Sequence, residues 1–307
     1  MEIGLVRARY EAAVDELVVD LRRDRQVVAI ALFGSLAYDV VWDRSDIDLM
    51  VVLAERPGDD HGRGMLCYGG VNVHTVLTTR DEFKRARSGA MFGSGWDSMN
   101  ETSRLLFSRD PTIDALFDER SVVGGRDQAT VILRYACQTV PTLTKAQKWL
   151  VAKGDLEYAS LWALFALQSL ARIEVVRRGL RPSREVIRQA LELDPDLFGA
   201  IYFDLLNKKK TKALVQDRIG RIDGYLRANG DELFAPIVGY LSERREPVFA
   251  GEIEHHFDRR HAVSGSVFAC EYLADNKVIE KTSVPVRLTR KSNVDVEGLA
   301  FMYLPDL

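Results

Sequence analysis

The sequence predicts an α/β domain with a mixed sheet, followed by an all-α helical bundle and a small α+β domain. Short apolar runs rich in Val, Ile and Leu occur within residues 1–124, and each has the length of a buried strand. Residues 125–230 place their apolar side chains at helical spacing. Residues 231–307 combine two helical stretches with two β-rich ones. These three patterns predict three domains with those boundaries.

The composition is typical of a globular protein. Of the 307 residues, 47% are apolar and 28% are charged, and the net charge is −3. A negative chain has no global attraction for nucleic acid, so any such contact must be local. The three cysteines, Cys67, Cys137 and Cys270, are far apart and lack metal-ligand spacing, which favours reduced thiols in the cytoplasm. We expect no signal peptide and no membrane span, and the composition allows either a monomer or an oligomer.

The first domain is predicted to begin with a helix and two strands. Apolar residues recur at helical spacing from residue 3 to residue 25, with charged residues between them. Two apolar runs follow at residues 27–33 and 49–53. Gly34-Ser35 ends the first run, and Asp46-Ile47-Asp48 opens the second.

The polar residues between these two runs indicate a nucleotide site. Side chains alternate between the faces of a strand, so Asp46 and Asp48 should share one face while their neighbours point into a core. Paired carboxylates repel each other unless a cation lies between them, and Mg²⁺ prefers carboxylates together with phosphate oxygens and water. Gly34 has no Cβ and lets a phosphate approach the backbone, and Ser35 can donate a hydrogen bond to it.

Alone, a Gly-Ser pair is only a turn, and two aspartates at a strand end often only reach solvent. Here they occur in order, separated by ten residues, between two apolar runs. The stretch resembles the GS-x10-DxD motif of the DNA polymerase β-type nucleotidyltransferase superfamily, in particular minimal nucleotidyltransferases and kanamycin nucleotidyltransferase-like enzymes. The resemblance implies that Asp46 and Asp48 bind Mg²⁺. It also implies that Gly34 and Ser35 bind the phosphates of ATP or another nucleoside triphosphate.

A β-hairpin is predicted next, with strands at residues 65–68 and 71–77 and Gly69-Gly70 in its turn. In the family that this chain resembles, the second hairpin strand carries a third carboxylate, which helps to hold the metal and can act as general base. His74 stands at that position, and Asn72 shares its face. A neutral imidazole can accept a proton or bind a metal, Mn²⁺ more readily than Mg²⁺. The alternative is that His74 is only a polar strand residue in a decayed site.

The rest of the first domain offers weaker signals. Thr79 and Glu82 have the spacing of a capping box, which predicts a helix over residues 79–86. The glycine- and serine-rich residues 92–101 are interpreted as a loop lying over the site. Residues 103–114 are predicted to form a strand and a turn.

The second domain is predicted to be helical throughout. Residues 159–176 are apolar on nearly all sides, as is typical of the central helix of a bundle. Periodic stretches at residues 186–193, 197–206 and 214–226 complete roughly five helices. The bundle resembles that of kanamycin nucleotidyltransferase-like enzymes. Some bundles that partner minimal nucleotidyltransferases are ribonuclease toxins with an Arg-x4–6-His motif, but no histidine occurs between residues 126 and 230.

Two lysines of the first bundle helix, Lys145 and Lys148, are three residues apart and share a face. In the two-domain enzymes that this chain resembles, a lysine near this point reaches the nucleotide phosphates across the interdomain cleft. Both lysines are therefore candidate nucleotide-binding residues, and a solvated helix face is the alternative.

The third domain is predicted to contain helices at residues 252–257 and 263–275, then strands at 278–289 and 294–303. A helix-turn-helix followed by two strands resembles a winged helix, whose second helix would read DNA.

The charges of this winged-helix-like domain do not favour DNA reading. Glu271 and Asp275 in its second helix repel phosphates, and basic residues lie instead in the turn, at Arg259 and Arg260, and in the strands. We interpret the domain as a packing or protein-interaction module, with weak, non-specific nucleic-acid binding as the alternative.

The fold class is therefore an α/β nucleotidyltransferase domain, an all-α bundle and a small α+β winged-helix-like domain. The resemblance implies transfer of a nucleoside monophosphate from a nucleoside triphosphate to a hydroxyl acceptor with Mg²⁺. The nucleoside monophosphate that we expect is AMP. The catalytic residues would be Asp46, Asp48 and His74. The acceptor could be a small molecule, an RNA or a protein. The alternative function is a weakly active or inactive nucleotide-binding regulator that binds DNA through its C-terminal domain.

Overall fold

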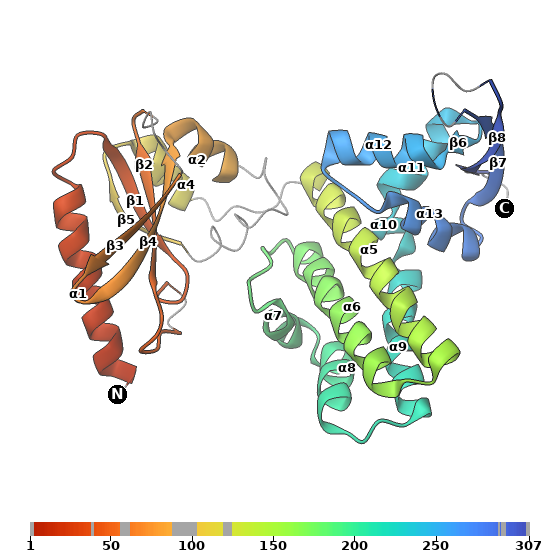
Figure 1. Cartoon of the computed structure of the whole chain (residues 1–307), viewed down its shortest axis with the longest axis horizontal. Helices are drawn as coiled ribbons and strands as arrows, with labels where there is room; N and C mark the ends of the chain where they lie inside the picture. Colours follow the sequence, from red (N-terminus) through yellow and green to blue (C-terminus); the bar gives the residue numbers. More distant parts are fainter. Residues whose placement is uncertain are drawn as a thin grey trace. The chain divides into compact units, whose positions relative to one another are not determined.

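The computed structural model describes residues 3–37, 40–55, 62–87, 103–118, 125–287, 289 and 293–304. The chain divides into two compact units, Met1–Val122 and Val123–Leu307 (Figure 1). A further division of the second unit at residue 230 stays a prediction. The residues 92–101, interpreted above as a loop over the site, lie outside the described residues.

The first unit contains a five-stranded mixed sheet, as the sequence predicts. Its strand order is β3-β4-β2-β1-β5, with β2 and β4 parallel and the other neighbours antiparallel. The described elements are α1 (Ile3–Leu21), β1 (Val27–Phe33), β2 (Ile47–Leu53), β3 (Arg63–Tyr68), β4 (Val71–Thr79), α2 (Arg80–Arg87), β5 (Arg104–Ser108) and α4 (Pro111–Asp118).

Helices cover both faces of this sheet (Figure 1). On one face, Ile47 and Leu49 of β2 pack with the apolar side of α1, including Leu17. On the other face, Met50 and Val52 of β2 pack with Phe83 of α2 and with α4. Because successive side chains of β2 point to opposite faces, Asp48 lies on the same face as Met50.

Local sequence signals are confirmed in the hairpin and at the start of α2. Gly69 and Gly70 both have positive φ, 54° and 69°, as a two-residue primed turn requires. The predicted capping box forms, because the Thr79 N–H donates to Glu82 Oε2 at 3.0 Å and the Glu82 N–H donates to Thr79 Oγ1 at 3.4 Å. The prediction for residues 103–114 is wrong in part: α4 begins at Pro111, where the Asp110 carboxylate accepts from the Thr112 N–H.

The second unit begins with a helical bundle around α6. Residues 159–176 are its buried centre, as predicted. The length and composition of α6 alone would also suit a membrane span, but 67% of that segment is buried inside the bundle. The bundle contains α5 (Gly125–Lys148), a π-helical turn (Trp149–Lys153), α6 (Leu156–Arg177), α7 (Val186–Leu193), α8 (Pro195–Asn207), α9 (Lys212–Ala228), α10 (Gly230–Leu233) and α11 (Ala235–Arg244).

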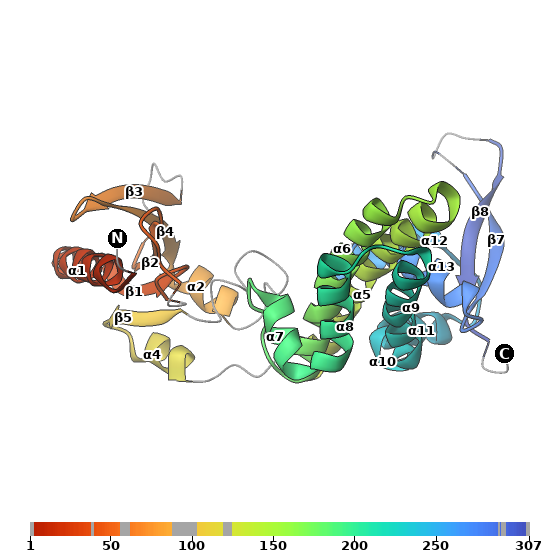
Figure 2. The same cartoon turned by 90° about the horizontal axis from the view of Figure 1, so that it is seen from below.

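A small winged-helix-like arrangement follows in the same compact unit. Strand β6 (Val248–Phe249) leads into α12 (Ala250–His261) and α13 (Ser266–Asp275), and the hairpin of β7 (Glu280–Val286) and β8 (Val296–Met302) extends beside them (Figure 2). The sheet order is β6-β8-β7. One expectation is wrong: Arg259 and Arg260 belong to the last turn of α12 and not to the connecting turn. Basic residues at that end favour a longer helix because of its dipole.

Helix α13 is held against the bundle by α5. Arg134 of α5 donates to the carbonyl oxygens of His261 at 3.0 Å and Ala262 at 3.1 Å, just before α13. Tyr272 of α13 donates to Asp223 Oδ1 of α9 at 3.0 Å. These contacts hold α13 and the segment before it against the bundle, and the interpretation of the C-terminal residues as a packing module stays a prediction.

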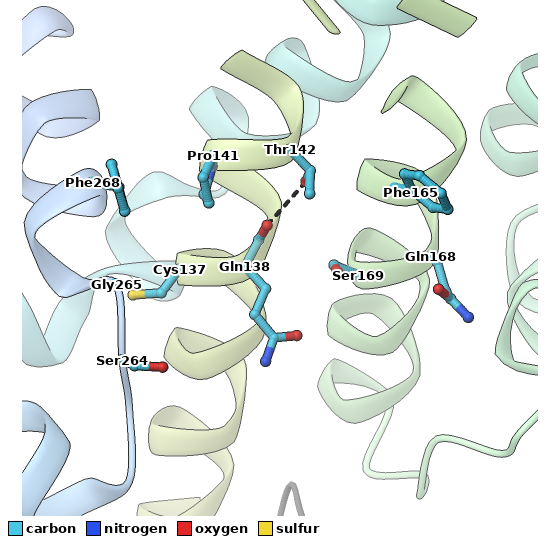
Figure 3. Close-up of a pocket in the computed structure, with 10 residues that line it drawn as sticks. All are labelled: Cys137, Gln138, Pro141, Thr142, Phe165, Gln168, Ser169, Ser264, Gly265 and Phe268. Carbon is cyan, nitrogen blue, oxygen red and sulfur yellow. Dashed lines mark hydrogen bonds between the residues drawn. The ribbon is translucent and has the colours of Figure 1, made fainter. Parts of the chain in front are cut away.

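A groove of about 540 Å³ lies along this contact. Figure 3 shows Phe268 of α13 on one side, Phe165 of α6 on the other, and Gln138 and Thr142 of α5 between them. Both phenylalanines are about half exposed. The groove is open to solvent and is lined by both polar and apolar side chains. It follows the contact between α5, α6 and α13.

Glu254 of α12 caps the N-terminus of α13. Its carboxylate accepts from the N–H of Gly265 at 2.6 Å, the hydroxyl of Ser266 at 2.7 Å and the N–H of Val267 at 3.2 Å. Burial favours the neutral acid, but these hydrogen bonds outweigh burial and hold the pKa of Glu254 below its ordinary value.

We expect Glu254→Gln to lower the free energy of unfolding at pH 7 by about 1–2 kcal/mol, the usual worth of a helix cap or charged hydrogen bond. The carboxylate stabilises the fold above its pKa in the unfolded chain, about 4.5, and that contribution is lost as the pH falls towards the lower folded pKa. The gap between wild type and variant should therefore shrink below about pH 4.5. Urea unfolding at pH 7 and pH 4 measures it, with the exposed Glu243→Gln as control. An equal gap at both pH values would contradict the capping role.

Candidate active site

The candidate site lies where three neighbouring strands, β1, β2 and β4, come together. Asp48 of β2 pairs with Phe33, the last residue of β1, and on its other side with His74 of β4. Asp46 precedes the first residue of β2 by one position. The parallel register of β2 and β4 thus places the imidazole on the same face as the two carboxylates.

The side chains of these residues converge. His74 Nε2 lies 3.9 Å from Asp46 Oδ2, and His74 Nδ1 lies 3.8 Å from Asp48 Oδ1. The three side chains are 41%, 40% and 30% exposed, respectively, so the cluster is open to solvent. His74 therefore lies beside the aspartate pair, where the family resemblance implies an acid. Asn72 is exposed and pairs with Cys67 across the hairpin.

Gly34 lies directly against Asp48. It follows β1 with φ = 74°, and a Cβ at this position would be 2.1 Å from Asp48 Oδ2. Only glycine therefore leaves room for the carboxylate in this position. Ser35 is half-buried in the turn that follows, where the Ala37 N–H donates to the Gly34 carbonyl at 3.0 Å.

A tyrosine of α1 fixes the segment before Asp46. The buried Tyr10 donates a hydrogen bond to the carbonyl oxygen of Ser45 at 2.6 Å. The Ser45 hydroxyl in turn accepts from the Trp42 N–H at 3.2 Å. Sequence reasoning missed this contact because Tyr10 fits the apolar stripe of an amphipathic helix, and nothing local distinguishes its hydroxyl.

Lys145 and Lys148 lie in the last turn of α5, in the second compact unit, and both are exposed. The Lys145 ammonium lies 4.3 Å from the ring centroid of Trp162, a favourable cation–π distance. Their role as phosphate ligands stays a prediction.

The donor set fits an Mg²⁺ ion that is completed by substrate. Among the described residues, no three His, Cys, Asp or Glu side chains form a ready-made metal site. Mg²⁺ does not need one, because proteins commonly hold it by one or two carboxylates while phosphates and water supply the other oxygens. Asp46 and Asp48 offer such a pair, and the imidazole is the less suitable ligand.

Comparison with known proteins identifies a family match and a similar fold. Residues 16–71, which span β1, the turn and β2, match the family model described as "Polymerase beta, Nucleotidyltransferase". Comparison with curated protein sequences gives no significant match. The fold is similar to the crystal structure of a nucleotidyltransferase-like protein from Exiguobacterium sibiricum, with a TM-score of 0.62 and 16% sequence identity over 96% of this chain and 99% of that one. At that identity the likeness concerns the fold alone.

Proposed function

We propose, from the membership of this chain in the polymerase β-type nucleotidyltransferase superfamily, that it transfers AMP from ATP to a hydroxyl acceptor. The observation that carries the proposal is the convergence of His74, Asp46 and Asp48 beside Gly34. ATP is the first nucleotide to test, and the acceptor remains open among small molecules, RNA and proteins. We expect the protein to work in the cytoplasm.

In this reaction the acceptor oxygen forms a bond to the α-phosphorus while the bond from that phosphorus to the β-phosphate oxygen breaks, and pyrophosphate leaves. Gly34 and Ser35 bind the β- and γ-phosphates, because the glycine leaves the backbone open and the hydroxyl can donate. The imidazole of His74 can accept the proton of the hydroxyl group through one ring nitrogen, and its other nitrogen can contact the metal. Asp46 and Asp48 would hold Mg²⁺, which stabilises the negative charge on the phosphates.

The second candidate is a nucleotide-binding regulator without turnover. The observation that favours it is His74 itself, because an imidazole stands beside the aspartate pair in place of a carboxylate. Pyrophosphate release separates the two functions. The full chain is incubated with ATP, Mg²⁺ and a panel of hydroxyl acceptors, and any labelled acceptor is identified by its mass shift. Acceptor-dependent release supports the transferase, and nucleotide binding without release supports the regulator.

The metal preference of His74 gives a sharper test. We expect wild type to release pyrophosphate faster with Mn²⁺ than with Mg²⁺, because the softer ion accepts an imidazole more readily. His74→Asp should reverse that order, because a carboxylate binds Mg²⁺ better than an imidazole does. The rate with Mg²⁺ should rise by about tenfold or more, which corresponds to about 1.4 kcal/mol of additional transition-state stabilisation. Rates with both metals measure this, with the exposed Asn72→Asp as a control for an acid added elsewhere on β4. Fast turnover of wild type with Mg²⁺, unchanged in His74→Ala, would remove His74 from the site.

A further inference from the structure

A charged cavity lies between α11 and α12, remote in sequence from the strands of the candidate site. Its volume is about 320 Å³. The lining combines arginines, histidines, a tyrosine and one glutamate: Tyr240, Arg244, Glu252, His255, His256, Arg259 and Arg260. With neutral histidines the lining carries three positive charges and one negative charge.

The negative charge is already used within the protein. Glu252 Oε1 lies 3.0 Å from Arg244 Nη1 and accepts a hydrogen bond from the Tyr240 hydroxyl at 3.3 Å. Arg244 Nη2 donates to the same hydroxyl at 2.9 Å. The ring of His256 stacks on the ring of Tyr240, with centroids 4.1 Å apart, and so packs along the same side of the cavity. On this side of the cavity, Arg244, Glu252 and Tyr240 bind one another, and the charges of Arg244 and Glu252 cancel.

The other two arginines have no such balance. Neither Arg259 nor Arg260 has an ion-pair or hydrogen-bond partner in the part of the chain that the structure describes. The positive charge of Arg260 also acts on two neighbouring histidines. The pKa values of His256 and His261 lie below their ordinary value, first because the rings are partly buried and second because Arg260 is close. The cavity is thus positively charged and lacks a counterion.

We propose that this cavity binds the phosphate group of a small anion, such as a pyrophosphate or a nucleotide, through Arg259 and Arg260. Guanidinium groups match phosphate oxygens with paired, charge-assisted hydrogen bonds. His255, exposed on the same helix, offers a further donor when it is protonated. Free phosphates are favoured over a duplex backbone because the donors line a cavity between two helices.

The dipole of α12 offers a purely structural explanation for these arginines, without a ligand. Basic side chains stabilise the last turn of a helix whether or not a ligand exists. That explanation accounts for their presence near His261 but predicts no saturable binding of an anion. Titration with a defined anion therefore separates the two explanations.

The test is calorimetric titration of the full chain with inorganic pyrophosphate in the presence of EDTA, which removes Mg²⁺-dependent binding at Asp46 and Asp48. We expect one saturable event in wild type. In Arg259→Gln/Arg260→Gln the affinity should fall at least about tenfold, because each lost charged hydrogen bond is worth that much or more. Arg184→Gln/Arg188→Gln, at two exposed arginines before and within α7, is the control of equal charge change.

A second readout follows the histidines, of which the chain has five. Pyrophosphate should raise the NMR titration midpoint of His256 in wild type, because a bound anion offsets Arg260 and Arg244, and should leave it unmoved in the double variant. Absence of binding at millimolar pyrophosphate would overturn the proposal, as would equal affinity in the double variant and the control. Duplex DNA that binds through the same arginines and is not displaced by pyrophosphate would also overturn it, in favour of nucleic acid.

Discussion

Asparagine at both position 46 and position 48 should abolish Mg²⁺-dependent binding of ATP and slow pyrophosphate release by at least about a thousandfold. The change removes two negative charges and keeps the size of both side chains. A metal ion contributes several kcal/mol to stabilising the charge of the transition state, and each 1.36 kcal/mol is worth a factor of ten in rate. Calorimetric titration with ATP and Mg²⁺ and a pyrophosphate assay measure the two effects.

Asp43→Asn is the matched control for this double variant. Asp43 is exposed, lies three residues before Asp46, and belongs to the same connection between β1 and β2. We expect it to bind ATP and turn over as wild type does. If the double variant keeps Mg²⁺-dependent binding of ATP, the aspartates are not the metal ligands and the site assignment fails.

Gly34→Ala should be the most damaging single substitution of the turn. A Cβ at this position would be 2.1 Å from Asp48 Oδ2, so either the carboxylate or the turn must move. Displacement of a reacting group by about 1 Å commonly costs a hundredfold in rate, so we expect at least that loss of turnover. The positive φ of 74° adds about 1–2 kcal/mol of backbone strain to the folded state.

Gly70→Ala separates strain from contact. Gly70 has a similar φ of 69°, and a Cβ there would meet nothing within 4 Å. Both variants should lose free energy of unfolding in urea from backbone strain, and Gly34→Ala should lose more because of its contact with Asp48, while only Gly34→Ala should lose turnover. Equal turnover in the two variants would mean that the contact between Gly34 and Asp48 is not needed.

The features of the fold that could be predicted from sequence are those fixed by local chemistry. The Gly69-Gly70 turn and the Thr79–Glu82 capping box depend on residues a few positions apart, and both form. The features that were missed depend on distant partners. Helix α11 was not predicted, because its buried side is defined by packing against α5 and β8. Helix α12 extends past its predicted end to His261, where Arg134 of α5 binds its last carbonyl.

The same division holds for the candidate site. The alternation of β2 is enough to place Asp46 and Asp48 on one face. The nearness of His74 also needs the parallel pairing of β2 with β4, which no local pattern fixes. The hydrogen bond from Tyr10 to Ser45 joins residues 35 positions apart, so it is invisible in the sequence. The phosphate roles of Lys145 and Lys148 come from the family resemblance and await their own test.

The packing of the C-terminal elements on α5 bears on how the second unit folds and how it can be cut. Leu233, Phe234, Ile237 and Leu241 are fully buried, and α10, α11 and α13 all contact α5. A fragment ending at residue 230 would leave the facing side of α5 in water. Each large apolar side chain so exposed costs roughly 1.5–3 kcal/mol, and a domain has only about 5–15 kcal/mol in total. Residues 123–307 should therefore melt in one cooperative transition, and a shortened protein should aggregate before it shows what the remaining part does.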